Sequence, residues 1–437
     1  MMTLNKILLF LFALPAAAQV SEGQLVALRP APLFRSPSPV SGEGIPECYE
    51  TRERVRDWLS APVGDFRSAD PGYFRQNTDG ATVRVVVQTS PEAVYGVFLI
   101  QEDFSFPLVR PGNYVIKRDS RDGSFVQIKI FLQSHEGSFI RIFPLQNRVH
   151  MDVYLLGRPL YQDLVLPLSF EGALTAPLSQ IMELCRGRVD WEIFAPPPPG
   201  RRGESLSPVI RAIRERLPGL GDSEDGAMSA EGRYVFIETL EEQPPGQEGF
   251  NCSGFAKWIV DGFIWPATGR LLGIQELKQK PLEVRGSPYS RYSEESRDPF
   301  FGLDWTRALA VSLARFRRPG TALSPEARDV RRVPFFEYVE DVGYRLEDLP
   351  VILYLLSREN PGRFYLGSVN LPFGSAPVLR QHIHTAVFFP YFTPEGKFET
   401  AVMERNVETS LESLASRYPG AHVHLSYAEG EGDFILP

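Results

Sequence analysis

The stretch GFNCSGFAKWIVDG, residues 249–262, places a cysteine where a helix is expected to begin. Asn251 is a good N-cap residue, and apolar side chains then recur at helical spacing, at Phe255, Trp258, Ile259 and Phe263. Cys252 therefore takes the first helical position, where unpaired amide groups and the helix dipole favour a thiolate. Its neighbours Ser253 and Gly254 are small and leave room for a substrate. Cys252 is thus a candidate nucleophile; the alternative is a buried structural thiol, because cysteine is among the most buried residue types.

A nucleophilic cysteine needs a base, and the base usually needs a group that orients it. The segment HIHTAVFFPYF, residues 382–392, is expected to form a strand. Because side chains two residues apart on a strand project to the same face, His382 and His384 are expected to share one face. His384 is the candidate base, and His382 is interpreted as its neighbour.

The orienting group is expected on the strand that follows the turn TPEGK. If this turn is centred on its glutamate, antiparallel pairing places Asn406 opposite His384. The same pairing places Glu404 opposite Ala386, on the same face. A register slip of one residue would put Arg405 opposite the histidine instead. The hairpin therefore predicts that a histidine and a Glu/Asn pair converge near the cysteine.

These features resemble the NlpC-type family of cell-wall cysteine peptidases. GFNCSGFAKWIVDG is similar to the nucleophile motif of that family, in which a polar residue and Cys-Ser-Gly precede a hydrophobic helix. HTAVFF followed by FETAVMERN resembles the histidine hairpin of this papain-like superfamily, and its Glu-x-Asn ending is similar to the CHAP amidohydrolase branch. The resemblance implies that Cys252 is the nucleophile and His384 the general base. It further implies that Glu404 and Asn406 are the orienting or oxyanion-side polar groups.

The resemblance also suggests two secondary site residues. Tyr234, in GRYVFIET, sits where NlpC-type enzymes have an active-site tyrosine, although the Trp-Gly-Gly that follows it in the family is absent. Ser253 adjoins the nucleophile on the substrate or oxyanion side. The resemblance covers about residues 230–262 and 380–427. The segment between them, at about 265–375, is therefore expected to be a long insertion that forms a lid or a substrate wall.

The implied activity is that of an exported cysteine hydrolase that cleaves an amide bond in peptidoglycan stem peptides and needs no cofactor. In the implied mechanism, His384 takes the thiol proton, the thiolate attacks an amide carbonyl, and the backbone N–H of Cys252 helps to hold the oxyanion. One alternative is a catalytically inactive papain-like domain that serves as a binding module. Another is a zinc-binding protein, because HIH and HVH each place two imidazoles on one strand face, at His382, His384, His422 and His424.

The chain is expected to contain two domains. Residues 80–194 hold evenly spaced runs of Val, Ile, Phe and Tyr that alternate at period two, which predicts an all-β sandwich-like domain. Residues 195–204, APPPPGRRGE, form a proline-rich linker, since proline lacks an amide donor and favours a stiff extended chain. Residues 205–437 mix helical and strand patterns. The fold class is therefore α+β, with the papain-like, NlpC-type domain and its insertion after the β domain.

The N-terminus is typical of a secretory signal peptide, residues 1–18. Lys6 precedes an apolar run from Ile7 to Leu14, and three alanines form a small-residue cleavage site. Residues 19–79 are predicted to form an extended leader with a short helix at ECYETRERVRDWL. No later run reaches the roughly 18 apolar residues that a transmembrane helix requires. The mature protein is expected to be periplasmic or secreted.

Export affects how the three cysteines are interpreted. An oxidising compartment lets thiols pair, and an odd count leaves one over. Cys48 and Cys185 both precede the proline-rich linker, so a disulfide between them with Cys252 free is the economical arrangement. Other pairings, or buried free thiols, remain open.

Charge narrows the range of partners. The formal net charge is −8, and the basic residues are scattered along the chain. Nucleic-acid binding requires a concentrated positive surface, so it is not expected. The expected partner is a peptidoglycan or peptide substrate, and the sequence leaves the oligomeric state open.

Overall fold

The computed structural model describes residues 45–437 apart from 283–284, 286–291, 293, 295–297 and 376–377. The expected signal peptide, residues 1–18, lies outside the described residues, as does the leader up to residue 44. The chain divides into two compact units, Met1–Ala195 and Pro196–Pro437. This division falls at the start of the proline-rich segment.

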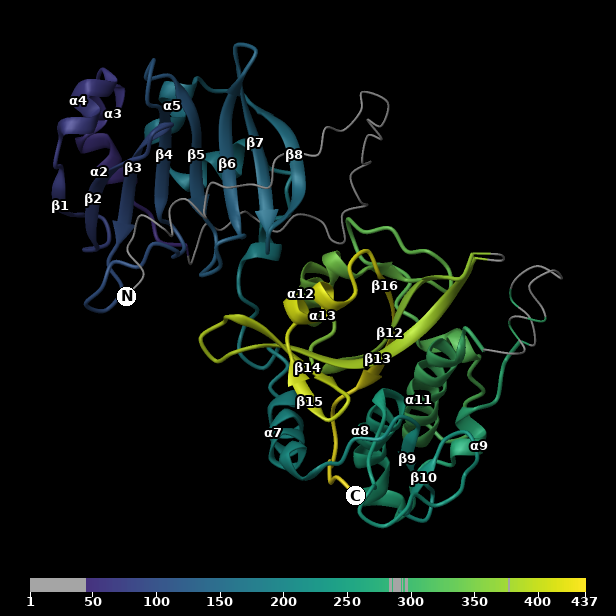
Figure 1. The fold of residues 1–437 in the computed structure, drawn as a ribbon. Coiled ribbons are helices and arrows are strands. Elements are labelled where there is room, and N and C mark those ends of the chain that lie inside the picture. The colour runs from purple at the N-terminus through teal and green to yellow at the C-terminus, as the bar shows by residue number, and fades with distance from the viewer. Residues whose placement is uncertain (1–44, 283–284, 286–291, 293, 295–297, 376–377) are drawn as a thin grey trace. The chain divides into compact units, whose positions relative to one another are not determined.

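The first unit contains an eight-stranded antiparallel sheet whose strands follow one another in chain order (Figure 1). The strands are β1 Gly72–Arg75, β2 Thr82–Thr89, β3 Ala93–Ile100, β4 Tyr114–Asp119, β5 Phe125–Phe131, β6 Phe139–Leu145, β7 Arg148–Leu155 and β8 Arg158–Leu166. The helices are α2 Tyr49–Arg54, α3 Arg56–Ser60, α4 Val63–Ser68, α5 Phe170–Thr175 and α6 Leu178–Leu184, with a 3₁₀ turn at Trp191–Phe194. The alternating runs of the sequence correspond to β2–β8.

The expectation of a β-rich domain is confirmed, but the strands do not separate into two sheets. All eight are hydrogen-bonded in a single sheet. Helices provide a covering layer: the ring of Trp58 in α3 stacks on Phe66 in α4 at 4.6 Å and lies 6.4 Å from Phe98 in β3. Period-two alternation shows that a strand buries one face, and it leaves open whether a sheet or helices cover that face.

The expected disulfide is absent, because all three cysteines are free thiols. The Cys48 thiol lies 3.7 Å from the carbonyl oxygen of Gly112, and the Cys185 sulfur lies 3.8 Å from Arg188. Both cysteines are fully buried, each among its own neighbours. Burial raises the pKa of the Cys48 thiol to about 12, against the opposing effect of Arg52. The number of cysteines in a sequence shows only that a disulfide is possible. It does not show whether two thiols lie close enough in the fold to form one.

The second unit is built on a six-stranded antiparallel sheet of order β11-β16-β12-β13-β14-β15. These strands are β11 Tyr344–Arg345, β12 Arg363–Phe373, β13 Leu379–Phe392, β14 Phe398–Glu404, β15 Val407–Thr409 and β16 His422–Glu429, and a separate pair is formed by β9 Gly226–Met228 and β10 Tyr234–Phe236. The helices are α7 Leu206–Arg216, α8 Cys252–Thr268, α9 Ile274–Leu277, α11 Phe301–Arg317, α12 Leu349–Glu359 and α13 Leu411–Arg417. Short 3₁₀ turns lie at Leu217–Gly219, Pro325–Arg328 and Leu346–Asp348. The mixed α/β class of this unit is confirmed.

Helices cover both faces of this sheet. Figure 1 shows α8 and α11 on one side and α12 and α13 on the other. On the first side, Phe263 of α8 stacks on Phe364 of β12 with ring centroids 5.2 Å apart. On the second, the ring of Tyr354 in α12 lies 5.3 Å from that of Phe392 in β13. The sheet is thus the middle layer of the unit, and α8 lies against it along its length.

The segment expected to be an insertion, about 265–375, belongs to this core. It supplies α11, which packs on α8, and β12, which pairs with both β13 and β16. The Trp305 indole of α11 donates a hydrogen bond of 2.9 Å to the carbonyl oxygen of Ser253, at the start of α8. After β14, Val407–Thr409 forms strand β15, and helix α13 begins at Leu411.

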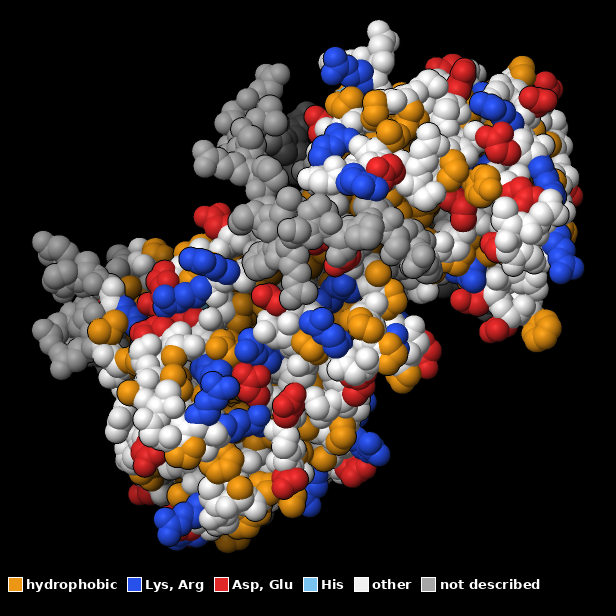
Figure 2. All heavy atoms as spheres, turned by 180° about the vertical axis from the view of Figure 1, so that it is seen from behind, with side chains coloured by type: hydrophobic (Ala, Val, Ile, Leu, Met, Phe, Trp, Pro, Cys, Tyr) orange, Lys and Arg blue, Asp and Glu red, His pale blue; other side chains and the backbone are white. Residues whose placement is uncertain are grey.

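On the face in Figure 2, acidic and basic side chains are interspersed over each unit. Within the described ranges, no helix combines the length and the apolarity needed to cross a membrane.

Candidate active site

Cys252 is the first residue of α8, as expected. The Asn251 side chain caps the helix by accepting a hydrogen bond of 2.7 Å from the Gly254 amide. Gly254 permits close packing on β9, because a Cβ atom there would lie 1.9 Å from the carbonyl oxygen of Gly226. The helix start is therefore held against a neighbouring strand, and the half-buried thiol lies at its tip.

The candidate base, His384, and the candidate orienting carboxylate, Glu404, lie on the β13–β14 hairpin. The pairing runs from Phe392 with Phe398 to Val387 with Met403, which brings Ala386 level with Glu404. This is the register expected from a turn centred on Glu395. The ring nitrogen Nε2 of His384 lies 2.5 Å from Oε2 of Glu404, and both side chains are buried. His384 also interacts with the Cys252 thiol, since each of the two groups shifts the pKa of the other, so the imidazole interacts with both the thiol and the carboxylate.

The electrostatics of these three groups support an ion pair. Burial opposes the charged form of Cys252, yet its hydrogen bond to His384 and the imidazolium charge lower the thiol pKa below its ordinary value. Further hydrogen bonds from the Thr385 backbone amide and the Ser253 side chain act in the same direction. For His384, burial also opposes charge, but hydrogen bonds to Cys252 and Glu404 raise its pKa to about 9. Both shifts favour the form of the pair in which a thiolate lies beside an imidazolium.

Asn406 does not pair with His384. Strand β14 ends at Glu404, and the next two residues turn in the left-handed region, with φ of 41° at Arg405 and 68° at Asn406. Asn406 instead donates hydrogen bonds to the carbonyl oxygens of Gly221, at 2.7 Å, and Phe250, at 3.3 Å. The prediction that Asn406 lies opposite His384 is thus wrong, because the chain turns before the β13–β14 pairing reaches Asn406.

The two secondary candidates lie on either side of the helix start. Tyr234 in β10 is half-buried, and its ring centroid is 5.2 Å from that of Phe250, two residues before the cysteine. Ser253 is buried next to Cys252, and its side chain lowers the pKa of the thiol. Ser253 therefore joins the candidate site directly, whereas Tyr234 is placed beside the segment that leads into it.

Two residues that sequence reasoning missed complete the site. Arg417, the last residue of α13, bonds to Oε1 of Glu404, the oxygen that His384 leaves free. The ring of Tyr418, the next residue, stacks on the His384 ring with centroids 5.5 Å apart and planes at 26°. The sequence carries no local signal for either contact, since both depend on where the short helix α13 ends.

His382 and His384 do not share surroundings, contrary to the expectation. A register shift in the β12–β13 pairing lies between them, and the intervening Ile383 is exposed. His382 Nδ1 lies 2.9 Å from the Ser368 hydroxyl, and its Nε2 lies 3.0 Å from the carbonyl oxygen of Asp341. The extra residue turns His382 away from the His384 side.

Of the other two histidines, His424 takes part in a separate buried cluster, and His422 is half-buried. His424 lies 3.4 Å from Asp329 and 3.2 Å from the Tyr338 hydroxyl, and Arg307 pairs with the same aspartate at 2.7 Å. Among the residues that the structure describes, no group of three or more His, Cys, Asp or Glu side chains is arranged to hold a metal ion.

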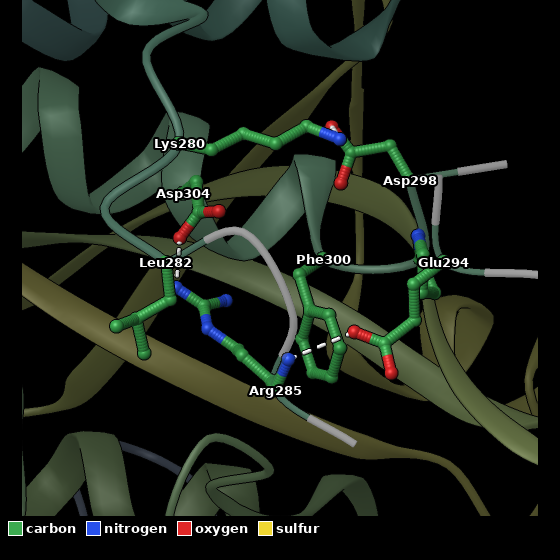
Figure 3. A pocket seen from close by; sticks show the side chains of 8 residues that line it. Lys280, Leu282, Arg285, Glu294, Asp298, Phe300 and Asp304 are labelled. Carbon is green, nitrogen blue, oxygen red and sulfur yellow. Dashed lines mark hydrogen bonds and ion pairs between the residues drawn. The ribbon is translucent and has the colours of Figure 1, made fainter. Parts of the chain in front are cut away.

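A small pocket lies beside the N-terminal end of α11 (Figure 3). Its lining includes Arg285, which bonds to Asp304 at 2.5 Å, and Phe300, whose ring centroid is 5.9 Å from that of His382. The pocket therefore adjoins His382, and neither Cys252 nor His384 lines it.

Comparison with known proteins identifies one region of similarity. Residues 41–193 match a protein-family model described as a domain of unknown function, DUF8515. This region lies within the first unit and contains none of the candidate site residues of the second. Comparison with curated proteins and with solved structures finds no match.

Proposed function

We propose that the second unit is a papain-like cysteine hydrolase that cleaves an amide bond, with Cys252 as nucleophile and His384 as general base. The observation that carries this proposal is the position of the His384 ring, which lies 2.5 Å from Glu404 and interacts with the Cys252 thiol at the start of α8. Cysteine nucleophile, base and orienting carboxylate are the parts that thiol-dependent acyl transfer requires. The likeness of GFNCSGFAKWIVDG to NlpC-type enzymes supports the same chemistry.

The proposed reaction has two steps. The Cys252 thiolate attacks the amide carbonyl carbon, and His384 gives a proton to the leaving amine as the C–N bond breaks. A water molecule then attacks the thioester, His384 takes one proton from that water, and the released thiolate restores the starting state. Glu404 keeps the imidazole oriented throughout and balances its positive charge. The backbone N–H of Cys252, at the helix start, is available to the oxyanion.

The substrate class in this proposal is the stem peptide of peptidoglycan. It rests on the NlpC-type resemblance, together with an N-terminus that is typical of a secretory signal. In this proposal the enzyme acts outside the cytoplasm, where the cell wall is found.

The test compares wild-type protein with Cys252→Ala on purified peptidoglycan, with released peptides followed by mass spectrometry. The wild type should release peptides, and Cys252→Ala should release none above the level without enzyme. His384→Ala should lose activity as well, whereas His422→Ala, a half-buried histidine elsewhere on the same sheet, should retain it. Release by Cys252→Ala at the wild-type rate would refute the proposal. Binding of peptidoglycan without cleavage by the wild type would favour the inactive binding module.

A further inference from the structure

The C-terminal end of α13 contacts the base and its carboxylate at once. Arg417 is the last residue of this helix, and Tyr418 is its C-cap. Arg417 bonds to Glu404, Tyr418 stacks on His384, and the Arg417 guanidinium lies 5.5 Å from the centre of the Tyr418 ring. Two adjacent residues of one short element therefore hold both partners of the His384–Glu404 pair.

The two oxygens of Glu404 have separate partners. Oε2 faces Nε2 of His384, and Oε1 faces Arg417. The carboxylate is buried, with 2% of its side chain exposed, so it depends on these partners for its hydrogen bonds. With Oε1 anchored, rotation of the carboxylate away from the imidazole would break a charge-assisted bond. Arg417 therefore restricts Glu404 to the orientation that points Oε2 at His384.

Tyr418 restricts the other partner. The planes of its ring and of the imidazole are nearly parallel, which limits rotation of His384 about its side-chain bonds. The contact is made by the ring, so a phenylalanine could replace it. Burial raises the pKa of the Tyr418 phenol, which therefore stays neutral beside the imidazole.

We propose that Arg417 and Tyr418 are positioning residues that hold the Glu404–His384 pair in the orientation needed to share a proton with Cys252. This inference rests on the proposed function. The charged and titratable groups around His384 are Cys252 on α8, Glu404 on β14, and Arg417 and Tyr418 at the end of α13, with Arg405 on the turn beyond Glu404.

The first test measures the rate of Cys252 alkylation by iodoacetamide against pH, with the adduct mapped by mass spectrometry. Arg417→Gln removes a positive charge and releases Glu404 from its ion pair. Both changes make the Cys252 thiolate less stable. The apparent pKa of Cys252 should rise, so the midpoint of the alkylation–pH curve should shift to higher pH. Arg417→Lys keeps the charge and should restore most of the wild-type profile. Arg214→Gln, which removes an exposed arginine from its pair with Glu408, is the matched control and should leave the profile unchanged.

The second test separates the ring of Tyr418 from its hydroxyl. Tyr418→Phe should retain the wild-type kcat on peptidoglycan fragments, and Tyr418→Ala should lower kcat about tenfold with little change in KM. Equal kcat for Tyr418→Ala and wild type would refute the role of Tyr418.

The outcomes distinguish this inference from the proposed function. If Cys252 of the wild type is alkylated with the pH profile of an ordinary cysteine, the proposed function itself fails. If the wild type has a reactive thiolate and Arg417→Gln shows the same profile, only the positioning role of Arg417 fails.

Discussion

The side-chain amide of Asn406 lies 3.3 Å from the carbonyl oxygen of Phe250, and this contact links the two halves of the candidate site. Asn406 follows the strand that carries Glu404, and Phe250 precedes Cys252 by two residues. A second bond, to the carbonyl oxygen of Gly221, strengthens the link. The turn after Glu404 is thereby tied to the segment that leads into Cys252.

Loss of this link should cost both stability and activity. Asn406→Ala removes two hydrogen bonds, to carbonyl oxygens that each keep one backbone donor, and places alanine at a φ of 68°, so the free energy of unfolding in urea should fall by about 1–3 kcal/mol. Asn406→Gly tolerates the backbone conformation and loses only the hydrogen bonds, so it should be the milder change. Equal losses for the two variants would show that the hydrogen bonds, rather than φ, determine the effect. If both variants unfolded at the same urea concentration as the wild type, the stabilising role of this link would be contradicted.

The pH dependence of Cys252 should differ from that of the other thiols. Its pKa is lowered by His384, whereas burial raises the pKa of Cys185, and that of Cys48 to about 12. Iodoacetamide at neutral pH should therefore label Cys252 first, with the two buried thiols as internal controls. Faster labelling of Cys48 in the folded protein would contradict this assignment.

Hydrolysis should fall on the alkaline side. The raised pKa of His384, about 9, means that its proton is held below that pH and lost above it. Because this proton must pass to the leaving amine, kcat should decline as the pH rises through about 9, while alkylation of the thiolate should not decline. A hydrolysis rate that is still rising above pH 10 would rule out His384 as the acid.

A buried ion pair within α8 should be costly to break. Lys257 and Asp261 have no exposed side-chain area and lie 2.6 Å apart, and Asp261 also accepts a hydrogen bond from the Leu272 amide. Asp261→Ala leaves a buried ammonium group unpaired, and the free energy of unfolding should fall by about 3–5 kcal/mol. The double variant Lys257→Met/Asp261→Leu removes both charges and should lose much less. Urea denaturation measures both.

The contact between Gly254 and Gly226 should tolerate no side chain. A Cβ atom at Gly254 would lie 1.9 Å from backbone oxygen, so Gly254→Ala must displace α8 from β9. The free energy of unfolding should fall by about 1–3 kcal/mol, and alkylation of Cys252 should slow because the thiol moves away from His384. Gly219→Ala is the control, because nothing lies within 4 Å of a Cβ atom there. Wild-type stability for Gly254→Ala would contradict the packing described.

The sequence predicted those parts of the site that local rules govern. Asn251 and the apolar spacing after it placed the start of α8, and the turn around Glu395 placed Glu404 level with Ala386. Local rules fail where the chain departs from regular pairing. The extra residue at Ile383 and the left-handed turn at Asn406 each redirected a side chain that simple alternation had placed beside His384.

Elements buried on all sides were also hard to identify. The segment LPVILYLLSRE forms α12, and a short, nearly continuous apolar run of this kind does not distinguish a buried helix from a buried strand. The roles of α11 and β12 in the core were missed for a different reason: the resemblance covered only the segments on either side of them. Arg417 and Tyr418 depend on tertiary packing alone.

The separation of the chain at Ala195 has an evolutionary consequence. The matched family region ends at residue 193, and every residue of the proposed thiol chemistry lies beyond the boundary. A gene that inherited only the matched region would inherit none of that chemistry. Conversely, a gene fusion that joined the second unit to an unrelated partner would transfer the cysteine, the histidine hairpin and the α13 contacts together.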